Sequence, residues 1–357
     1  MSKNKIYVVG SGWGSSSFVK NVDTNKYEVT VVSPSNNFTY TPLLANQIKD
    51  ENNLEIDIRS LNNINYKKGK VVNVNFKENK LITDNNEYSY DYLVLSHGSE
   101  INTFGIDGVN ENCYFIKSTE DASKIKYKLN DLPSGSKIAV IGCSLTGSEI
   151  IGNLIDYKKF NIYAIDGLNR PLSTFNNQIS NYALNLWKIN SVNFYFSNFV
   201  NKIDKNRIYF KSEAIDYDIA IWCGGIKISK LSNYINKLLN LECKFGIPVN
   251  KNLKVLNTNN VYAIGDCAYS NNPPTAQVAS QQGIYLARYF NNNFNGNEFK
   301  FNNKGQICYI GNGMSVYQNN KVYFTGKLTG YFNKVVHVYN SINLKQSINL
   351  LIQSQYK

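Results

Sequence analysis

The sequence has 357 residues, of which 38 are Lys or Arg and 26 are Asp or Glu, so its formal net charge is +12. An apolar share of 43%, with 7 prolines and 23 glycines, is typical of a globular protein and excludes disordered, proline-rich and collagen-like classes. No run approaches the roughly 18 apolar residues that a membrane-spanning helix needs. The length predicts two or three domains.

Cysteine and histidine usage limits the chemistry further. The six cysteines are at least 20 residues apart and form no C-x-x-C pair, and the two histidines are His97 and His337. We therefore expect reduced cysteines, an intracellular protein and no metal site. Because the first predicted strand begins near Lys5, we also expect no cleavable targeting signal.

The chain opens with a predicted βαβ unit. Residues 5–10 are a β-branched apolar run that ends in glycine, as buried parallel strands do. A helical pattern follows over 14–22, and a second apolar run covers 28–33. A strand, a glycine-rich turn, a helix and a strand within about 30 residues predict a nucleotide-binding unit.

The same plan recurs downstream, with a strand over 137–142, a helix over 146–157 and a strand over 161–166. The remaining predicted elements are short strands with a turn over 70–92, a buried strand over 92–96, hairpins over 192–210, strands over 219–223 and 261–265, and a helix over 275–291. Two such units predict an α/β protein with two Rossmann-like domains.

The first glycine-rich loop runs from Gly10 through Gly12 and Gly14 to Ser15. The first glycine permits the tight turn, the second lets a pyrophosphate approach, and the helix N-terminus offers N–H groups to phosphates. The acid expected to bind a ribose is replaced by Ser33, whose hydroxyl binds more weakly. The alternative is a tight turn without a ligand.

The second loop runs from Gly142 to Gly147, with Ser144 in place of the second glycine. Asp166 ends the next strand, where a carboxylate accepts hydrogen bonds from both ribose hydroxyls of NADH and repels the 2′-phosphate of NADPH. Glu149 falls in the first turn of the predicted helix, where a carboxylate suits the dipole. The alternative is a decayed Rossmann domain that only buries surface.

A third signal is Asp266, which follows a strand and a glycine. Two glycine loops and this late Gly-Asp, in this order, resemble the flavoprotein oxidoreductases with two dinucleotide folds. The chain from about residue 4 to 311 resembles type II NADH:quinone oxidoreductases in particular. The motifs are 38–44 (FTYTPLL), 90–95 (YDYLVL) with Gly98-Ser99, 102–106 (NTFGI), Asp156-Tyr157, 264–268 (IGDCA) and 273–283 (PPTAQVASQQG).

The resemblance implies FAD and NADH as cofactors and a quinone as acceptor. The residues it assigns to FAD are Gly10, Gly12, Gly14, Ser33, Thr41, Pro42, Gly98, Gly225 and Asp266, with Thr41 and Pro42 near the ring and Asp266 on the ribityl chain. Those it assigns to NADH are Gly142, Gly147, Glu149 and Asp166. Gln277 and Gln281 would line the quinone pocket and act in catalysis; the alternative is two solvent-exposed amides on a helix.

The resemblance also implies a domain order. We expect an FAD-binding domain made of residues 1–112 and 249–302, with an NADH-binding domain, 113–248, inserted in it. Residues 303–357 would form a C-terminal segment for membrane association or dimerisation.

The reaction implied is hydride transfer from NADH to flavin and two-electron transfer to quinone, without proton pumping. Three alternatives stay open: an enzyme similar to sulfide:quinone oxidoreductases, an NADH reductase with a soluble acceptor, and a non-catalytic flavin-binding protein on a decayed fold.

The residues from Lys327 onward predict how the protein reaches a membrane, where a quinone acceptor would lie. From Lys327, apolar residues recur at three-to-four spacing, including Leu328, Phe332 and Val335, and the pattern continues past residue 340. With the flanking lysines and the net charge of +12, this predicts an interfacial helix on anionic lipid, peripheral on the cytoplasmic face of a membrane. A helix that covers a domain or a homodimer partner is the alternative. Dispersed charge without a recognition motif excludes nucleic acid.

Overall fold

The structure is a computed structural model that describes residues 2–50 and 53–339. The chain packs into two compact units, each built from separate stretches. Among the described residues, unit 1 comprises the chain up to Thr39, Glu55–Glu100 and Ile226–Asn302, and unit 2 comprises those within Tyr40–Leu54, Ile101–Gly225 and the part from Asn303 to residue 339. The domain boundaries expected from the sequence stay a prediction.

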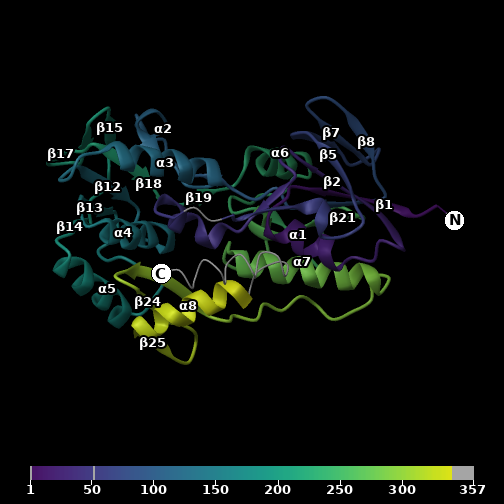
Figure 1. Ribbon diagram of the computed structural model, residues 1–357. Helices are drawn as coiled ribbons and strands as arrows, with labels where there is room; N and C mark the ends of the chain where they lie inside the picture. The colour runs from purple at the N-terminus through teal and green to yellow at the C-terminus, as the bar shows by residue number, and fades with distance from the viewer. Residues whose placement is uncertain (1, 51–52, 340–357) are drawn as a thin grey trace. The chain divides into compact units, whose positions relative to one another are not determined.

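Unit 1 is centred on a five-stranded parallel sheet in the order β21-β9-β1-β2-β5 (Figure 1). Its strands are β1 (Asn4–Val9), β2 (Tyr27–Ser33), β5 (Asn65–Lys68), β9 (Tyr92–Leu95) and β21 (Val261–Ala263). Central strands of such a sheet are covered on both faces, which explains their continuous apolar runs.

Two helices cover one face of this sheet, and three strands with one helix cover the other. On the first face, α1 (Trp13–Asn21) and α7 (Ala276–Asn291) lie side by side (Figure 1), and the rings of Phe18 and Phe290 meet edge to face at 5.6 Å. On the second face, the antiparallel strands β6 (Val71–Asn75), β7 (Lys80–Thr83) and β8 (Glu87–Ser89) pack with α6 (Lys230–Leu238). The remaining short elements of unit 1 are β3 (Asn37–Thr39), β4 (Glu55–Asp57), η2 (Ile58–Ser60), β19 (Ile226–Lys227), β20 (Ile247–Pro248), η3 (Gly265–Cys267) and β22 (Ala268–Tyr269).

Unit 2 repeats this plan with the parallel order β11-β18-β12-β13-β14. The strands are β11 (Cys113–Tyr114), β12 (Lys137–Ile141), β13 (Asn161–Asp166), β14 (Asn193–Phe196) and β18 (Ile219–Trp222). One face packs on α3 (Thr119–Asp131), α4 (Leu145–Tyr157) and α5 (Asn177–Ile189), and the other on the antiparallel strands β15 (Lys202–Asp204), β16 (Arg207–Tyr209) and β17 (Ala214–Asp216). Unit 2 also contains η1 (Thr41–Ile48) and α2 (Val109–Asn112), and β10 (Glu100–Ile101) spans the boundary between the units in sequence. The predicted α/β fold with two Rossmann-like units is confirmed.

Two sequence expectations need correction here. Residues 192–210 were expected to form hairpins, but β14 pairs in parallel with β13, and the hairpin begins only at β15. The C-terminal segment also contains an antiparallel sheet that the sequence did not predict, made of β23 (Gln306–Gly311), β24 (Met314–Gln318) and β25 (Tyr323–Gly326). Its strands are short and half exposed, so they lack the long apolar runs that mark buried strands.

The chain then enters α8 (Lys327–Tyr339), which packs against β24. This confirms the start of the helix expected from Lys327; its expected continuation beyond residue 339 lies outside the described residues. Within residues 2–50 and 53–339, no helix has both the length and the hydropathy needed to span a membrane.

Candidate functional site: two nucleotide-binding loops

The turn between β1 and α1 requires glycine at its first position. Gly10 has φ +104°, and its N–H donates a 2.9 Å hydrogen bond to the Val32 carbonyl of β2. A Cβ at residue 10 would lie 2.4 Å from the Ser96 carbonyl oxygen at the end of β9. The turn therefore brings the backbone of three parallel strands together at their carboxyl ends, where open α/β sheets bind ligands.

Gly12 has a different role in the same turn. Its φ of −79° and ψ of −166° suit any residue, and a Cβ there would meet nothing within 4 Å. The space that glycine leaves is therefore open to a ligand rather than needed by the protein.

The helix that follows Gly12 begins without a side-chain cap. The N-cap side chains of α3, α6 and α7 are Ser118, Ser229 and Thr275, and each accepts a backbone N–H of its own helix. By contrast, Gly12 gives α1 no side-chain cap, which leaves room for a ligand at the start of the helix. Open space at Gly12 and uncapped N–H groups fit the pyrophosphate of FAD.

The predicted flavin residues of unit 1 gather at this edge of the sheet. Ser33 lies at the end of β2, 3.3 Å from the Ser11 hydroxyl of the glycine loop, measured between the two oxygens. The Ser99 hydroxyl donates a 3.1 Å hydrogen bond to the Asp266 carboxylate, which joins the loop after β9 to the loop after β21. Gly98 has φ +72°, and Gly14 packs where a Cβ would lie 2.8 Å from the Ser96 hydroxyl.

Gln282 is a residue that sequence reasoning missed. It is fully buried on α7, its Oε1 accepts the Gly265 N–H at 2.7 Å, and its Nε2 donates to the Ser270 hydroxyl at 2.8 Å. These bonds hold the turn that carries Asp266 from both sides. The sequence feature that could have indicated Gln282 is its place next to Gly283. Because Gly283 has no Cβ, α7 packs directly against the Gly14 carbonyl of α1.

The two predicted quinone-pocket glutamines both lie on α7, four residues apart and therefore on one face. The amide of Gln281 is engaged at both ends, because it donates to the Asn302 carbonyl and accepts the Asn302 N–H, each at 2.9 Å. Gln281 therefore anchors the segment that follows α7. The quinone roles of Gln277 and Gln281 stay predictions.

His97 is an unusual residue at the end of β9. Its Nε2 lies 2.8 Å from the Ser232 hydroxyl of α6, whereas its Nδ1 is buried and has no partner in the described part of the chain. Burial lowers the pKa of His97 to about 4, so the ring is neutral at physiological pH. A neutral, packed imidazole agrees with a structural loop residue.

The loop between β12 and α4 repeats the first loop. Gly142 has φ +93°, and its N–H donates a 2.8 Å hydrogen bond to the Ile165 carbonyl of β13. A Cβ at Gly147 would lie 1.8 Å from the Gly142 carbonyl oxygen, so only glycine fits there. The N-cap is Ser144, whose side chain is exposed and makes no capping bond with the described residues, which leaves the α4 N–H groups available as well.

Asp166 is held beside this loop. One carboxylate oxygen accepts the Cys143 N–H at 2.6 Å, and the other accepts the Leu168 N–H at 2.8 Å. These bonds fix an anionic acceptor at the end of β13, where the ribose hydroxyls of NADH are expected. The carboxylate, the glycines and the uncapped helix together fit NADH.

The sequence reading of Glu149 was wrong in one respect. α4 begins at Leu145 and has no acid in its first turn, so Glu149 is not placed to interact with the helix N-terminus. Its carboxyl is instead packed on the second turn, where burial raises its pKa to about 8. Its assignment to NADH binding stays a prediction.

The other predicted flavin residues lie in unit 2. Thr41 and Pro42 form the start of η1, and Gly225, with φ +115°, accepts the Asn102 N–H at 3.0 Å. Their assignment to FAD stays a prediction.

A parallel sheet with a glycine turn and an uncapped helix, present twice, defines a protein with two dinucleotide-binding folds. Residues 4–283 match the family described as pyridine nucleotide-disulphide oxidoreductase. A probable NADH dehydrogenase of Dictyostelium discoideum is 30% identical, over 89% of this chain and 81% of that protein. The chain therefore belongs to the pyridine nucleotide-disulphide oxidoreductase family, and within it to the type II NADH dehydrogenases.

Two further proteins support this placement. The mitochondrial external NADH-ubiquinone oxidoreductase 2 of Saccharomyces cerevisiae is 29% identical; the match covers 81% of this chain but only 62% of the yeast protein. The solved structure of NDH2 from Plasmodium falciparum in complex with NADH superposes with a TM-score of 0.92 at 25% identity, covering 98% of this chain and 97% of that one. The six cysteines are all free.

Proposed function

We propose that the chain is an FAD-dependent NADH:quinone oxidoreductase of the non-proton-pumping type. The observation that carries this proposal is the duplicated, uncapped helix start after a glycine turn, at Gly12 in unit 1 and at Ser144 in unit 2. A single such start suits one nucleotide, whereas two suit an enzyme that binds FAD and NADH. The NADH-ubiquinone oxidoreductases among its relatives support quinone as the acceptor.

The protein's own residues would bind and orient the two dinucleotides. Gly10 and Gly12, with the start of α1, would hold the FAD pyrophosphate, and Asp266, positioned by Ser99 and Gln282, would bind the ribityl chain. Bound FAD would supply the redox chemistry, which is hydride acceptance from NADH and two-electron transfer to quinone. This division of work explains why the site needs no nucleophile or triad.

Asp166 favours NADH over NADPH. It is fixed by two backbone N–H groups, so it cannot easily turn away from a 2′-phosphate. Replacing it with a neutral residue removes that repulsion.

We further propose that α8 docks on an anionic membrane surface. Its buried face is small and polar: Thr329 and Asn333 are buried, and the Asn333 amide donates to the Ser315 hydroxyl of β24 at 3.2 Å. Its outer face is apolar, with Leu328 84% and Val335 62% exposed, together with Tyr331 and Phe332. A helix that turns its apolar side outward needs an apolar partner.

Charge supports lipid as that partner. Lys327 and Lys334 are exposed on the same helix, and Lys321 is exposed just before β25. Exposed apolar side chains beside lysines suit the headgroup region of an anionic bilayer, where each basic residue contributes about 1 kcal/mol. Such docking would place the enzyme peripherally, on the cytoplasmic face as the sequence suggests, within reach of a lipid-soluble quinone.

The decisive experiment for catalysis is an anaerobic NADH titration of the purified flavoprotein, followed by a short-chain quinone. The proposal expects the yellow absorption to bleach with NADH and to return with quinone. A flavin that NADH does not reduce would favour the non-catalytic alternative. A flavin that sulfide reduces and NADH does not would favour the sulfide:quinone alternative.

Flotation with liposomes tests the docking surface. Leu328→Asp and Val335→Asp should abolish binding to liposomes that contain phosphatidylglycerol. Lys188→Gln, on α5, lowers the net charge by the same single unit and serves as the charge-matched control. Binding that persists in both apolar variants would refute lipid docking. A wild-type dimer that these variants dissociate would identify a second copy of the chain as the partner instead.

A further inference from the structure

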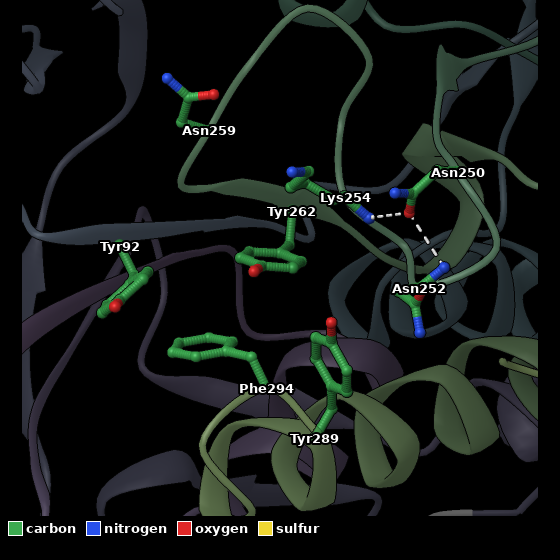
Figure 2. Close-up of a pocket in the computed structure, with 8 residues that line it drawn as sticks. All are labelled: Tyr92, Asn250, Asn252, Lys254, Asn259, Tyr262, Tyr289 and Phe294. Carbon is green, nitrogen blue, oxygen red and sulfur yellow. Dashed lines mark hydrogen bonds between the residues drawn. The ribbon is translucent and has the colours of Figure 1, made fainter. Parts of the chain in front are cut away.

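A cavity of about 300 Å³ lies in unit 1, away from the glycine loop (Figure 2). Its lining includes Tyr92, the first residue of β9, and Tyr262 of β21. The glycine loop is at the carboxyl ends of these parallel strands, so Tyr92 marks the opposite end of the sheet. The cavity is therefore separate from the proposed FAD site.

Aromatic rings form one side of the cavity. Tyr262 and Phe294 are nearly parallel, with ring centroids 6.4 Å apart and planes inclined by 12°. Tyr92 lies 5.0 Å from Phe294, and Tyr289 meets Phe294 edge to face at 5.8 Å. Figure 2 shows these four rings around a common space. Such a wall favours a planar aromatic ligand, because rings gain by offset and edge contacts.

The tyrosines also offer hydroxyl groups to the cavity. Tyr262 is only 4% exposed, and its hydroxyl, like those of Tyr92 and Tyr289, has no hydrogen-bond partner among the residues that the structure describes. Burial and the neighbouring tyrosines raise the pKa of Tyr262, so its hydroxyl keeps its proton. A tyrosine hydroxyl that borders the cavity and has no protein partner can donate to a ligand that accepts a hydrogen bond.

A single positive charge borders the same space. Lys254 pairs with Tyr262 in an isolated antiparallel bridge, which directs both side chains to one face. The turn that carries Lys254 is rigid, because the Asn250 Oδ1 accepts the N–H groups of Lys254 and Asn252 at 3.0 and 2.9 Å. No described acid pairs with the Lys254 ammonium, and no acid lines the cavity. A lining with one lysine ammonium and neutral hydrogen-bond donors fits a ligand that carries a single negative charge.

We infer that this cavity is a binding site for a planar aromatic monocarboxylate of one or two rings. The rings hold the ligand's aromatic part, while Lys254 and the Tyr262 hydroxyl bind its carboxylate. A cavity of about 300 Å³ is at the lower end of the range for small-molecule sites, which limits the ligand to that size.

The test uses three probes on the FAD-loaded enzyme with saturating NAD⁺, so that both dinucleotide sites are filled. The probes are 2-naphthoate, the uncharged 2-naphthylmethanol and the non-aromatic cyclohexanecarboxylate, measured by ligand-observed NMR and equilibrium dialysis. We expect 2-naphthoate to bind with one-to-one stoichiometry and the other two to bind at least about tenfold more weakly. No binding of 2-naphthoate at millimolar concentration would overturn the inference.

Matched lysine variants locate the site. Lys254→Met should weaken 2-naphthoate about tenfold, whereas Lys251→Met should leave it unchanged, because Lys251 is on the same turn but pairs with Glu298 at 3.1 Å and does not line the cavity. Tyr262→Phe should weaken binding several-fold. Equal affinity in wild type and Lys254→Met would overturn the inference. An unchanged flavin spectrum and melting temperature in the two lysine variants show that both are folded, so their comparison stands even if Tyr262→Phe is unstable.

Discussion

Gly12 and Ser144 occupy the same position in two copies of one loop and share one backbone conformation. Gly12 has φ −79° and ψ −166°, and Ser144 has φ −73° and ψ −158°. Neither conformation requires glycine, so the serine causes no backbone strain. What distinguishes the two loops is the side chain that Ser144 adds in front of the α4 N–H groups.

We therefore predict that Ser144→Gly tightens NADH binding. Removing the side chain lets the pyrophosphate approach the helix start, and the dissociation constant should fall about three- to tenfold. Ser144→Val, which adds bulk, should raise it more than tenfold. Calorimetric titration with NADH measures both. A weaker complex with Ser144→Gly would show instead that the serine hydroxyl binds the nucleotide.

The first loop offers a test that separates ligand binding from folding. Gly12→Ala should leave the melting temperature of the apoprotein unchanged, because the added Cβ meets no protein atom within 4 Å. It should still lower FAD affinity at least about tenfold, since it fills the space of the pyrophosphate. Gly10→Ala should destabilise the apoprotein itself by about 2 kcal/mol or more, owing to its φ of +104° and the Ser96 carbonyl. Normal FAD binding by Gly12→Ala would remove this loop from the flavin site.

Glu149 should lower the stability of the folded protein as the pH rises from 4.5 to about 8. Burial raises its pKa to about 8, so the folded carboxyl keeps a proton that the unfolded chain releases above its ordinary value of 4.5. The buried carboxyl therefore does not lower the free energy of unfolding below pH 4.5. It lowers it progressively as the pH rises from 4.5 toward 8. Glu149→Gln should melt at the same temperature as wild type at pH 4.5 but several degrees higher at pH 8.5. Equal melting curves at both pH values would contradict the shift.

His97 should have the opposite pH dependence. The folded ring has a pKa of about 4, whereas the unfolded chain binds a proton below about 6.5, so stability falls as the pH drops from 6.5 toward 4. His97→Gln, which keeps an amide near the Nε2 position that contacts Ser232, should lose less stability between pH 7.5 and 5 in urea unfolding. Part of the loss should remain, because burial lowers the pKa of His337 in the same way. An unchanged loss in His97→Gln would show that His97 does not contribute.

The sequence predicted most of what depends on local pattern. Continuous apolar runs identified β1, β12 and β13, and the glycine spacing identified both turns, because a buried parallel strand and a tight turn each restrict the residues they accept. The position of Asp166 followed from the end of β13. Its two bonds to backbone N–H groups could not be predicted, because they depend on how the glycine loop closes.

Features that depend on distant packing were missed or misread. The spacing of the apolar residues gives no role to Asn333, yet its side chain faces inward and donates to the Ser315 hydroxyl. Which side of α8 turns outward is decided by the sheet of β23, β24 and β25, which the pattern did not predict. Gln282 likewise acts through Gly265 and Ser270, neighbours that only the folded chain brings together.

The interleaving of the two units has a consequence for how the protein is made. Helix α1 ends at Asn21 and packs Phe18 against Phe290 of α7. Helix α7 is complete only after about 270 more residues have been synthesised. At about 5–20 residues per second, the apolar side of α1 stays uncovered for at least ten seconds of synthesis. We expect the nascent chain to depend on chaperones throughout that interval.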